Sequence, residues 1–291
     1  MSPLILPSRK IWTPPQRQRG YVVLDGYRGG SGSEPDYAHT VLQIHPGGSN
    51  GDTAITDTSS YARTLTRVGT TIQVVTDTDA PGGTALDYDG TVSCAYTAAT
   101  STELDMRAGA FMLDWKLKLD SNLTDGSAIC TILSMTKGDS GIQYEWSVFV
   151  QRDYVVFYHG KRGTNQSQVR FYYPGVATLS GAGGVQHDFS LGRDASGNWG
   201  AWLDGVRCAD YQYAPLAVSL SFGTKTTGTF NLTRDFGDYA GAVSGQALRV
   251  GNFFASGLAF AGHLNELRYV VGQCRYVAGN YTPRTTPFPD S

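Results

Sequence analysis

Carboxylates would carry catalysis in this 291-residue chain, and its glutamates are few. A retaining glycosidase needs two carboxyl groups across one glycosidic bond, and one strand can supply both at alternate positions. The four glutamates, Glu34, Glu103, Glu145 and Glu266, are remote from one another in sequence. Glu145 has no second carboxylate two residues away, and the chain contains no His-Glu-x-x-His motif. We therefore expect a protein without catalytic activity.

Glu266 and Arg268 alternate in the run LNELR, so they share one face of a strand. This spacing favours an ion pair or a turn anchor that fixes the fold, and a ligand contact is the alternative. Asp52 with Asp57, and Asp87 with Asp89, could supply oxygen ligands to calcium. Aspartates in glycine-rich turns usually accept hydrogen bonds from their own backbone, however. No cofactor is predicted, and calcium stays open as the alternative.

Tyrosine is abundant, with 17 residues, and several tyrosines lie close together in sequence. Their rings could stack on sugar rings or contact another protein, and the sequence does not separate these uses. The candidates for stacking on a glycan are Tyr172, Tyr173, Tyr211 and Tyr213.

Charge and cysteine spacing exclude several other classes of protein. The net charge is −2 and the basic residues are dispersed, so neither nucleic acid nor an anionic membrane is an expected partner. Cys94, Cys130, Cys208 and Cys274 never form the Cys-x-x-Cys spacing of a zinc site or redox pair. We expect buried thiols, with a disulfide framework as the alternative.

The elements that would position these residues are strands. In residues 187–208, His187, Phe189 and Leu191 alternate with polar residues, which predicts a strand with one buried and one solvated face. The alternation resumes at Trp199, and the pair Asp204-Gly205 is typical of a tight hairpin turn. The stretch therefore predicts three strands and two turns, which need a second layer to pack against.

Alternation and turn residues predict an all-β protein along the rest of the chain. Residues 213–245 are rich in Gly, Thr and Ser and predict a long loop, and prolines predict an extended tail over 276–291. The predicted strands cover residues 40–45, 62–68, 71–76, 84–88, 110–119, 128–135, 142–151, 154–159, 168–173, 246–251 and 260–271.

Residues 1–38 predict an extended arm that precedes the domain at 39–275. Its prolines and its Gly-Ser run prevent a helix or a central strand, yet it is too apolar for a solvated linker. The arm should dock on its own domain or on a neighbouring subunit. The residues that we expect to bind a partner are Leu4, Ile5, Leu6, Ile11 and Trp12. The apolar run at 4–6 is too short for a signal peptide.

Several stretches resemble the laminin-G-like jelly rolls of the concanavalin A-like lectin/glucanase superfamily, in the form found in structural proteins of tailed bacteriophages. The similar stretches are NGDTAITDTSSYARTLTRVGTT (50–71), GGTALDYDGTVSCAY (82–96), GAFMLDWKLKLD (109–120), HDFSLGRDASGNWGAWLDGVRC (187–208) and GHLNELRYVVGQCRYVAGNYTPRTTPFP (262–289). The resemblance implies a two-sheet antiparallel jelly-roll sandwich.

The same resemblance implies a non-enzymatic virion protein, used for capsid decoration or in the tail, that docks by its arm and forms a homo-oligomer or occurs in many copies in the particle. Its partners would be other virion proteins, and it would be assembled in the host cytoplasm without a signal peptide. The alternative is a carbohydrate-binding module, an adhesin that recognises polysaccharide on the host surface for attachment.

Overall fold

The computed structural model describes residues 37–90, 95–99, 104, 109–120, 129–137, 143–161, 165–174, 179, 184–217, 219–232, 246–251, 261–274 and 279–290. The chain divides into two units, Met1–Ser31 and Gly32–Ser291, and every described residue belongs to the second. The arm residues Leu4, Ile5, Leu6, Ile11 and Trp12 lie outside the described part, so their docking stays a prediction.

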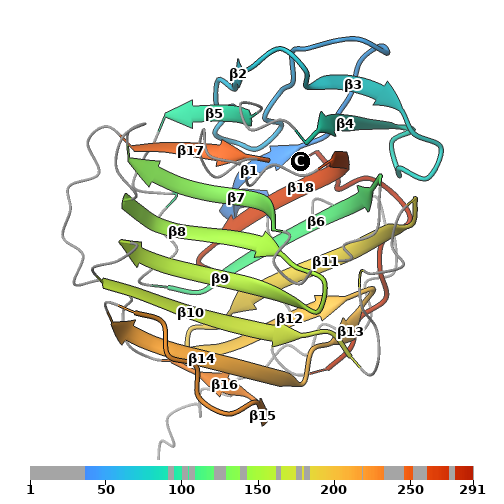
Figure 1. Cartoon of the computed structure of the whole chain (residues 1–291). Helices are drawn as coiled ribbons and strands as arrows, with labels where there is room; N and C mark the ends of the chain where they lie inside the picture. The colour runs from blue at the N-terminus through green and yellow to red at the C-terminus, as the bar shows by residue number, and fades with distance from the viewer. Residues whose placement is uncertain are drawn as a thin grey trace, which may run out of the picture. The chain divides into compact units, whose positions relative to one another are not determined.

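The second unit is a two-sheet antiparallel β-sandwich, which confirms the fold class predicted from the sequence (Figure 1). Sheet A has the order β13 (Val206–Arg207), β12 (Asn198–Leu203), β11 (Gln186–Arg193), β6 (Phe111–Leu119), β18 (Ala261–Val271), β4 (Thr84–Asp89), β3 (Gln73–Thr76), with β1 (Thr40–Ile44) on β18 and β16 (Phe230–Asn231) on β12. Sheet B has the order β15 (Thr226–Thr227), β14 (Asp210–Ala217), β10 (Asn165–Tyr172), β9 (Tyr154–Lys161), β8 (Gln143–Val150), β7 (Cys130–Lys137), β17 (Gln246–Val250), β5 (Ala95–Ala99), β2 (Thr66–Val68).

The meander at 187–208 forms as predicted, as β11, β12 and β13. Asp204 and Gly205 both have positive φ, 50° and 77°, and Leu203 pairs directly with Val206. Two consecutive residues of positive φ give the turn whose twist matches the flanking strands, so this two-residue hairpin is well formed.

Aromatic side chains from both sheets fill the space between them. Trp199 of sheet A lies 4.9 Å from the Phe157 ring of sheet B and 5.2 Å from Phe111, both as ring centroid distances. Trp115 stacks on Phe189 at 5.3 Å, and these side chains are almost completely buried. Alternation along β6 and β11 directs the rings of Phe111, Trp115 and Phe189 inward. The residues between them on the same strands therefore point to the outer face of sheet A.

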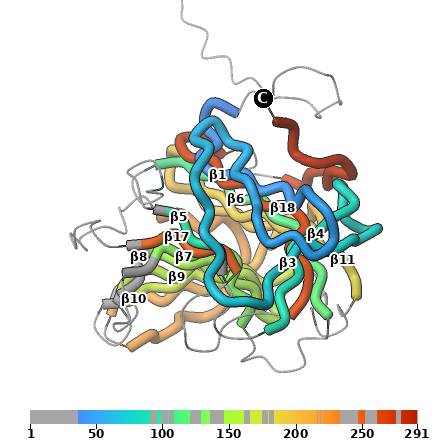
Figure 2. The backbone as a smooth tube through the Cα atoms, turned by 90° about the horizontal axis from the view of Figure 1, so that it is seen from above, coloured from blue at the N-terminus to red at the C-terminus, as the bar shows by residue number. Residues whose placement is uncertain are grey.

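The outer face of sheet A is not solvated, and in this respect the prediction from alternation is wrong. Asp114, Lys116 and Ser190 are each at most 6% exposed, although they alternate with core residues. The C-terminal segment, residues 279–290, lies across this face, on the side away from sheet B (Figure 2). The segment is extended, as its prolines predict, and the alternation of the strands carries no information about it.

The prediction of a long loop over residues 213–245 is wrong for residues 213–217. Asp210–Ala217 forms β14, which pairs with β10 along its length. The short strands β15 and β16 also lie within the stretch, and residues 233–245 are outside the described part. Tyr211 and Tyr213 alternate with Gln212 and so extend the sheet, a pattern that the surrounding Gly and Thr residues obscure in the sequence.

The cysteines agree in part with the expectation of buried thiols. Cys130 and Cys208 are buried free thiols, Cys274 is only half-buried, and Cys94 lies outside the described residues. Burial raises the pKa of each of these two thiols to about 12. In the described part of the chain, no helix has the length and the apolar character needed to cross a bilayer.

Candidate ligand-binding surface

The four candidate tyrosines separate onto the two faces of sheet B. Tyr211 and Tyr213 point inward, and each ring lies 5.1 Å from the ring of Phe230. Tyr173 is 5% exposed and its hydroxyl donates to the backbone oxygen of Gln151, so it presents no ring face to solvent. Burial raises the pKa of Tyr173 well above its ordinary value. Tyr172 alone of the four lies on the outer face.

Tyr172 belongs to a group of aromatic and basic side chains that we call the aromatic patch. It consists of Tyr154, Arg170, Tyr172, Phe222 and Lys225. Tyr154 and Tyr172 are directly opposite on β9 and β10, and their ring centroids are 5.2 Å apart in an edge-to-face arrangement. The next residues inward on each strand, Val155 and Phe171, belong to the core, which fixes the two tyrosines outward.

Arg170 lies at the centre of the aromatic patch. Its guanidinium carbon is 3.6 Å from the ring centroid of Phe222 and 4.9 Å from that of Tyr154. Such contacts hold the planar group in place through cation–π attraction. Burial raises the pKa of Tyr154, and the positive charge of Arg170 partly offsets that increase.

The segment after β14 forms one side of the patch. Gln212 Nε2 donates to the backbone oxygen of Gly223 at 2.9 Å, which places Phe222 beside β10. Lys225 Nζ lies 4.5 Å from the Tyr172 ring centroid and 2.8 Å from Asp210 Oδ2. Hydrogen bonds from Lys225 and Thr227 lower the pKa of Asp210. The patch thus combines half-buried rings with hydrogen-bonding groups.

A small apolar cluster continues from the patch over the outer face of sheet B. Phe149, Val156 and Tyr158 are buried there, and Tyr154 and Leu220 pack against them. The hydroxyls of Thr131 and Ser147, also outward on their strands, are buried and have no hydrogen-bond partner within the described ranges. The outer face of sheet B therefore differs from the solvated face of an ordinary sandwich, because it carries apolar and aromatic side chains.

Comparisons with known proteins give structural likeness only. No family model and no curated protein matches the chain. The binding domain of botulinum neurotoxin serotype C1 aligns with TM-score 0.47 and 13% identity over 80% of this chain and 49% of that one. The binding domain of Paraclostridial Mosquitocidal Protein 1 aligns with TM-score 0.48 and 9% identity over 86% of this chain and 50% of that one.

A third similar structure is that of botulinum neurotoxin type C in a study of its interaction with two ganglioside molecules, with TM-score 0.48 and 13% identity over 82% of this chain and 49% of that one. This chain spans about half the length of each. At these scores and identities, the likeness assigns no ligand or partner to this chain.

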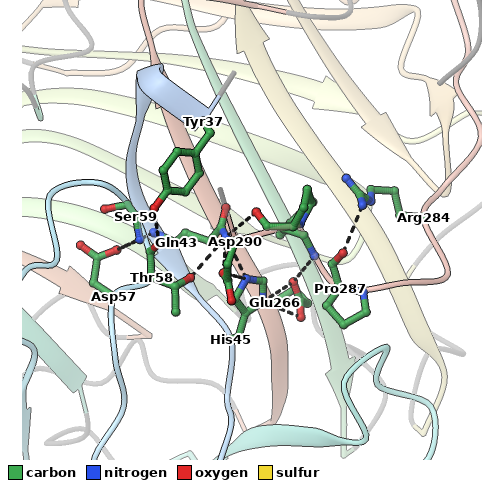
Figure 3. A network of polar contacts seen from close by, with 12 residues as sticks. Tyr37, Gln43, His45, Asp57, Thr58, Ser59, Glu266, Arg284, Pro287 and Asp290 are labelled. Atoms are coloured by element: carbon green, nitrogen blue, oxygen red, sulfur yellow. Dashed lines mark hydrogen bonds and ion pairs between the residues drawn. The ribbon is translucent and has the colours of Figure 1, made fainter. Parts of the chain in front are cut away.

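The outer face of sheet A carries a second polar group, which holds the C-terminal segment (Figure 3). His45 Nδ1 lies 2.9 Å from a Glu266 carboxylate oxygen, and His45 Nε2 lies 3.0 Å from Asp290 Oδ1. Glu266 Oε2 also accepts from the backbone nitrogen of Phe288 at 3.1 Å. Glu266 is thus an ion-pair partner and a tail anchor, which is the structural role that the sequence favoured.

Arg268 pairs with Asp114 at 2.8 Å, and not with Glu266 as the shared face suggested. Its guanidinium carbon also lies 4.1 Å from the Phe288 ring centroid. Asp114 Oδ1 accepts from Ser190, whose hydroxyl contacts Tyr281 at 2.8 Å. These buried groups contact one another and the tail, so they form a structural network.

The remaining candidates have structural roles or lie outside the described side chains. Asp57 accepts from the backbone nitrogens of Gln43, Ser59 and Arg63, and Asp52 from that of Ser49, as the turn interpretation predicts. Asp87 lies 3.9 Å from His263, and no metal-binding group of three His, Cys, Asp or Glu residues occurs in the described part. Of the glutamates, only Glu266 has a described side chain.

The sequence reasoning identified Tyr172 but missed its neighbours. Tyr154 alternates with Val155 and Phe157 in β9, so its outward position was readable from the pattern. Arg170 alternates with Val169 and Phe171 in the same way. The position of Phe222 could not be predicted from the sequence pattern, because only the fold of the segment after β14 brings it to the patch.

Proposed function

We propose that this domain is a non-enzymatic binding module that recognises a saccharide on the outer face of sheet B. The observation that carries the proposal is the aromatic patch, with Tyr154 and Tyr172 side by side on adjacent strands. Rigid aromatic rings offer apolar contact area to a sugar at low conformational cost, and nearby polar groups fix its orientation. Gln212, Asp210 and Lys225 are the polar groups beside these rings.

A binding role suits the described chemistry better than catalysis does. Glu266 and Asp114 are buried, and each already has a cationic partner on the covered face of sheet A. A retaining mechanism needs two carboxyl groups about 5 Å apart beside the substrate, with one free to donate a proton. Neither group is presented to a substrate while the C-terminal segment lies over it.

The test is a glycan array with the full chain, followed by calorimetric titration of the saccharides that bind. We expect Tyr172→Ala to reduce affinity about tenfold or more, since loss of one stacked ring removes roughly 1–3 kcal/mol. Tyr61→Ala is the matched control, because Tyr61 is 42% exposed, lies in the turn after Asp57 and is not one of the residues of the aromatic patch. No binding to any saccharide, or equal loss in both variants, would reject the proposal.

A second proposal places the same domain in a phage particle, as a capsid-decoration or tail-associated protein. It is supported by the sequence resemblance, above all that of residues 262–289, and by the apolar arm. Tyr37 donates to the backbone oxygen of Thr58, so a deletion should spare it and remove residues 1–36 only. The shortened chain should fold and no longer join the particle; incorporation at the wild-type level would exclude docking by the arm.

A further inference from the structure

Arg170 differs from Lys225 and Arg152 in having no anionic partner in the part of the chain that the structure describes. Lys225 pairs with Asp210 at 2.8 Å, and Arg152 pairs with Asp153 at 2.7 Å. Within the described residues, Arg170 makes no ion pair, and its contacts are with the rings of Tyr154 and Phe222. Its Nε is buried and has no hydrogen-bond acceptor among the described residues.

This arrangement leaves a fixed cation unsatisfied. A half-buried charge is costly unless it is paired, and ring faces compensate only part of the lost solvation. The rings contact the guanidinium through its face, and the planar fork of N–H groups suits an acceptor with two oxygens. A carboxylate has that geometry.

The position of Arg170 also fits a ligand that stacks on the tyrosines. Arg170 and Tyr172 lie two residues apart on the outer face of β10, which is about 7 Å along a strand. Arg170 pairs in register with Gln212 of β14, and Tyr172 pairs with Asp210. One sugar ring with a carboxylate substituent can therefore contact an aromatic ring and the guanidinium together.

We infer that the ligand of this surface is a saccharide that carries a carboxylate, such as a uronic acid polymer, and that Arg170 binds the carboxylate. The inference rests on the proposed saccharide-binding function and adds the charge of the ligand. Of the two cations of the patch, Lys225 is paired with Asp210, so the charge of Arg170 remains. The local charge thus favours an anion although the chain as a whole has a net charge of −2.

The experiment titrates the full chain with oligogalacturonate and with its methyl ester, which keeps the sugar rings and removes the charge. We expect the acid to bind roughly 10- to 100-fold more tightly than the ester, the range for a charge-assisted hydrogen-bonded pair. Arg170→Gln should abolish this preference, and Arg170→Lys should restore part of it, since an ammonium keeps the charge without the two-pronged geometry. Tyr172→Ala should weaken the acid and the ester by a similar factor.

The outcomes separate the two claims. Equal affinity for acid and ester, or an unchanged preference in Arg170→Gln, overturns the inference while the saccharide-binding function stands. Binding of neither probe, together with tight binding of poly-glutamate, shows an acidic protein partner and overturns both. Far-UV circular dichroism and the melting temperature of each variant confirm that it is folded, and Arg170→Lys retains a test if Arg170→Gln fails to fold.

Discussion

His45 is the residue whose protonation bears most directly on how the C-terminal segment is held. It lies between the carboxylates of Glu266 and Asp290, at 2.9 and 3.0 Å. Burial disfavours its charged form, but the hydrogen bond and negative charge of Glu266 and the charge of Asp290 outweigh burial and raise the pKa of His45 above 6.5. The protonated imidazole therefore joins β1, β18 and the tail.

Because the pKa is raised by folding, the stabilisation should be complete below pH 6.5 and should be lost as the pH rises through the folded-state pKa. We predict that His45→Gln lowers the free energy of unfolding by roughly 1–3 kcal/mol at pH 5.5. The difference from wild type should shrink by pH 9, and urea unfolding at the two pH values measures it.

Asp290→Asn is the matched control, since it removes only the exposed carboxylate, whose side chain is 58% exposed. Its effect should have the same pH dependence as that of His45→Gln and a smaller size. An effect of His45→Gln that is the same at both pH values would mean that His45 acts through its shape and neutral hydrogen bonds alone.

At the scale of elements, the C-terminal segment acts as a covering layer on sheet A. Trp202 Nε1 donates to the backbone oxygen of Gly279 at 2.7 Å, and Tyr281 N donates to the oxygen of Gly205 at 2.9 Å. A β-carbon at Gly205 would lie 2.0 Å from the Tyr281 oxygen, so the turn residue is glycine for two reasons, its φ of 77° and this close approach.

We predict that Phe288→Ala destabilises the domain by about 2–4 kcal/mol, because a buried ring is lost and Arg268 beneath it loses a face contact. Thr285→Ala, an exposed change in the same segment, should cost less than about 0.5 kcal/mol. Urea unfolding compares the two variants. A loss below 0.5 kcal/mol for Phe288→Ala would show that the tail is not part of the folded unit.

Sequence patterns predicted the strands and turns better than they predicted what packs against the outer faces of those strands. Alternation at Phe111, Trp115 and Phe189 identified the core face of β6 and β11, and Asp204-Gly205 identified the hairpin. The burial of Asp114 and Lys116 was not predictable, because it depends on the tail, far away in sequence. The aromatic patch was only partly predictable, because its residues come from two strands and a later segment that only the fold brings together.

At the scale of the whole molecule, the sandwich separates two uses of its outer faces. The outer face of sheet A is covered by the chain's own C-terminal segment, and the outer face of sheet B carries the aromatic patch. A ligand surface on sheet B is therefore structurally independent of the polar contacts of His45 that hold the C-terminal segment on sheet A. Substitutions in the aromatic patch should leave those contacts unaffected, and substitutions at His45 should leave ligand binding unaffected.

The N-terminal arm is predicted to act outside the domain. Its apolar residues lie between prolines and cannot bury one another in a helix. We predict that Ile11→Ala combined with Trp12→Ala weakens assembly with a partner, at roughly 1.5–3 kcal/mol for each lost side chain, and leaves the melting temperature of the isolated protein unchanged. Particle incorporation and thermal unfolding measure the two effects, and a melting temperature lower by many degrees would mean that the arm packs on its own domain.

The central claim is that the ligand binds on the outer face of sheet B, and amide hydrogen exchange of the full chain with and without oligogalacturonate locates it most directly. The account predicts slower exchange in β9, β10, β14 and residues 219–225, and unchanged exchange in β18 and residues 279–290. Protection confined to β18 and the C-terminal segment, with none in β10, would contradict it.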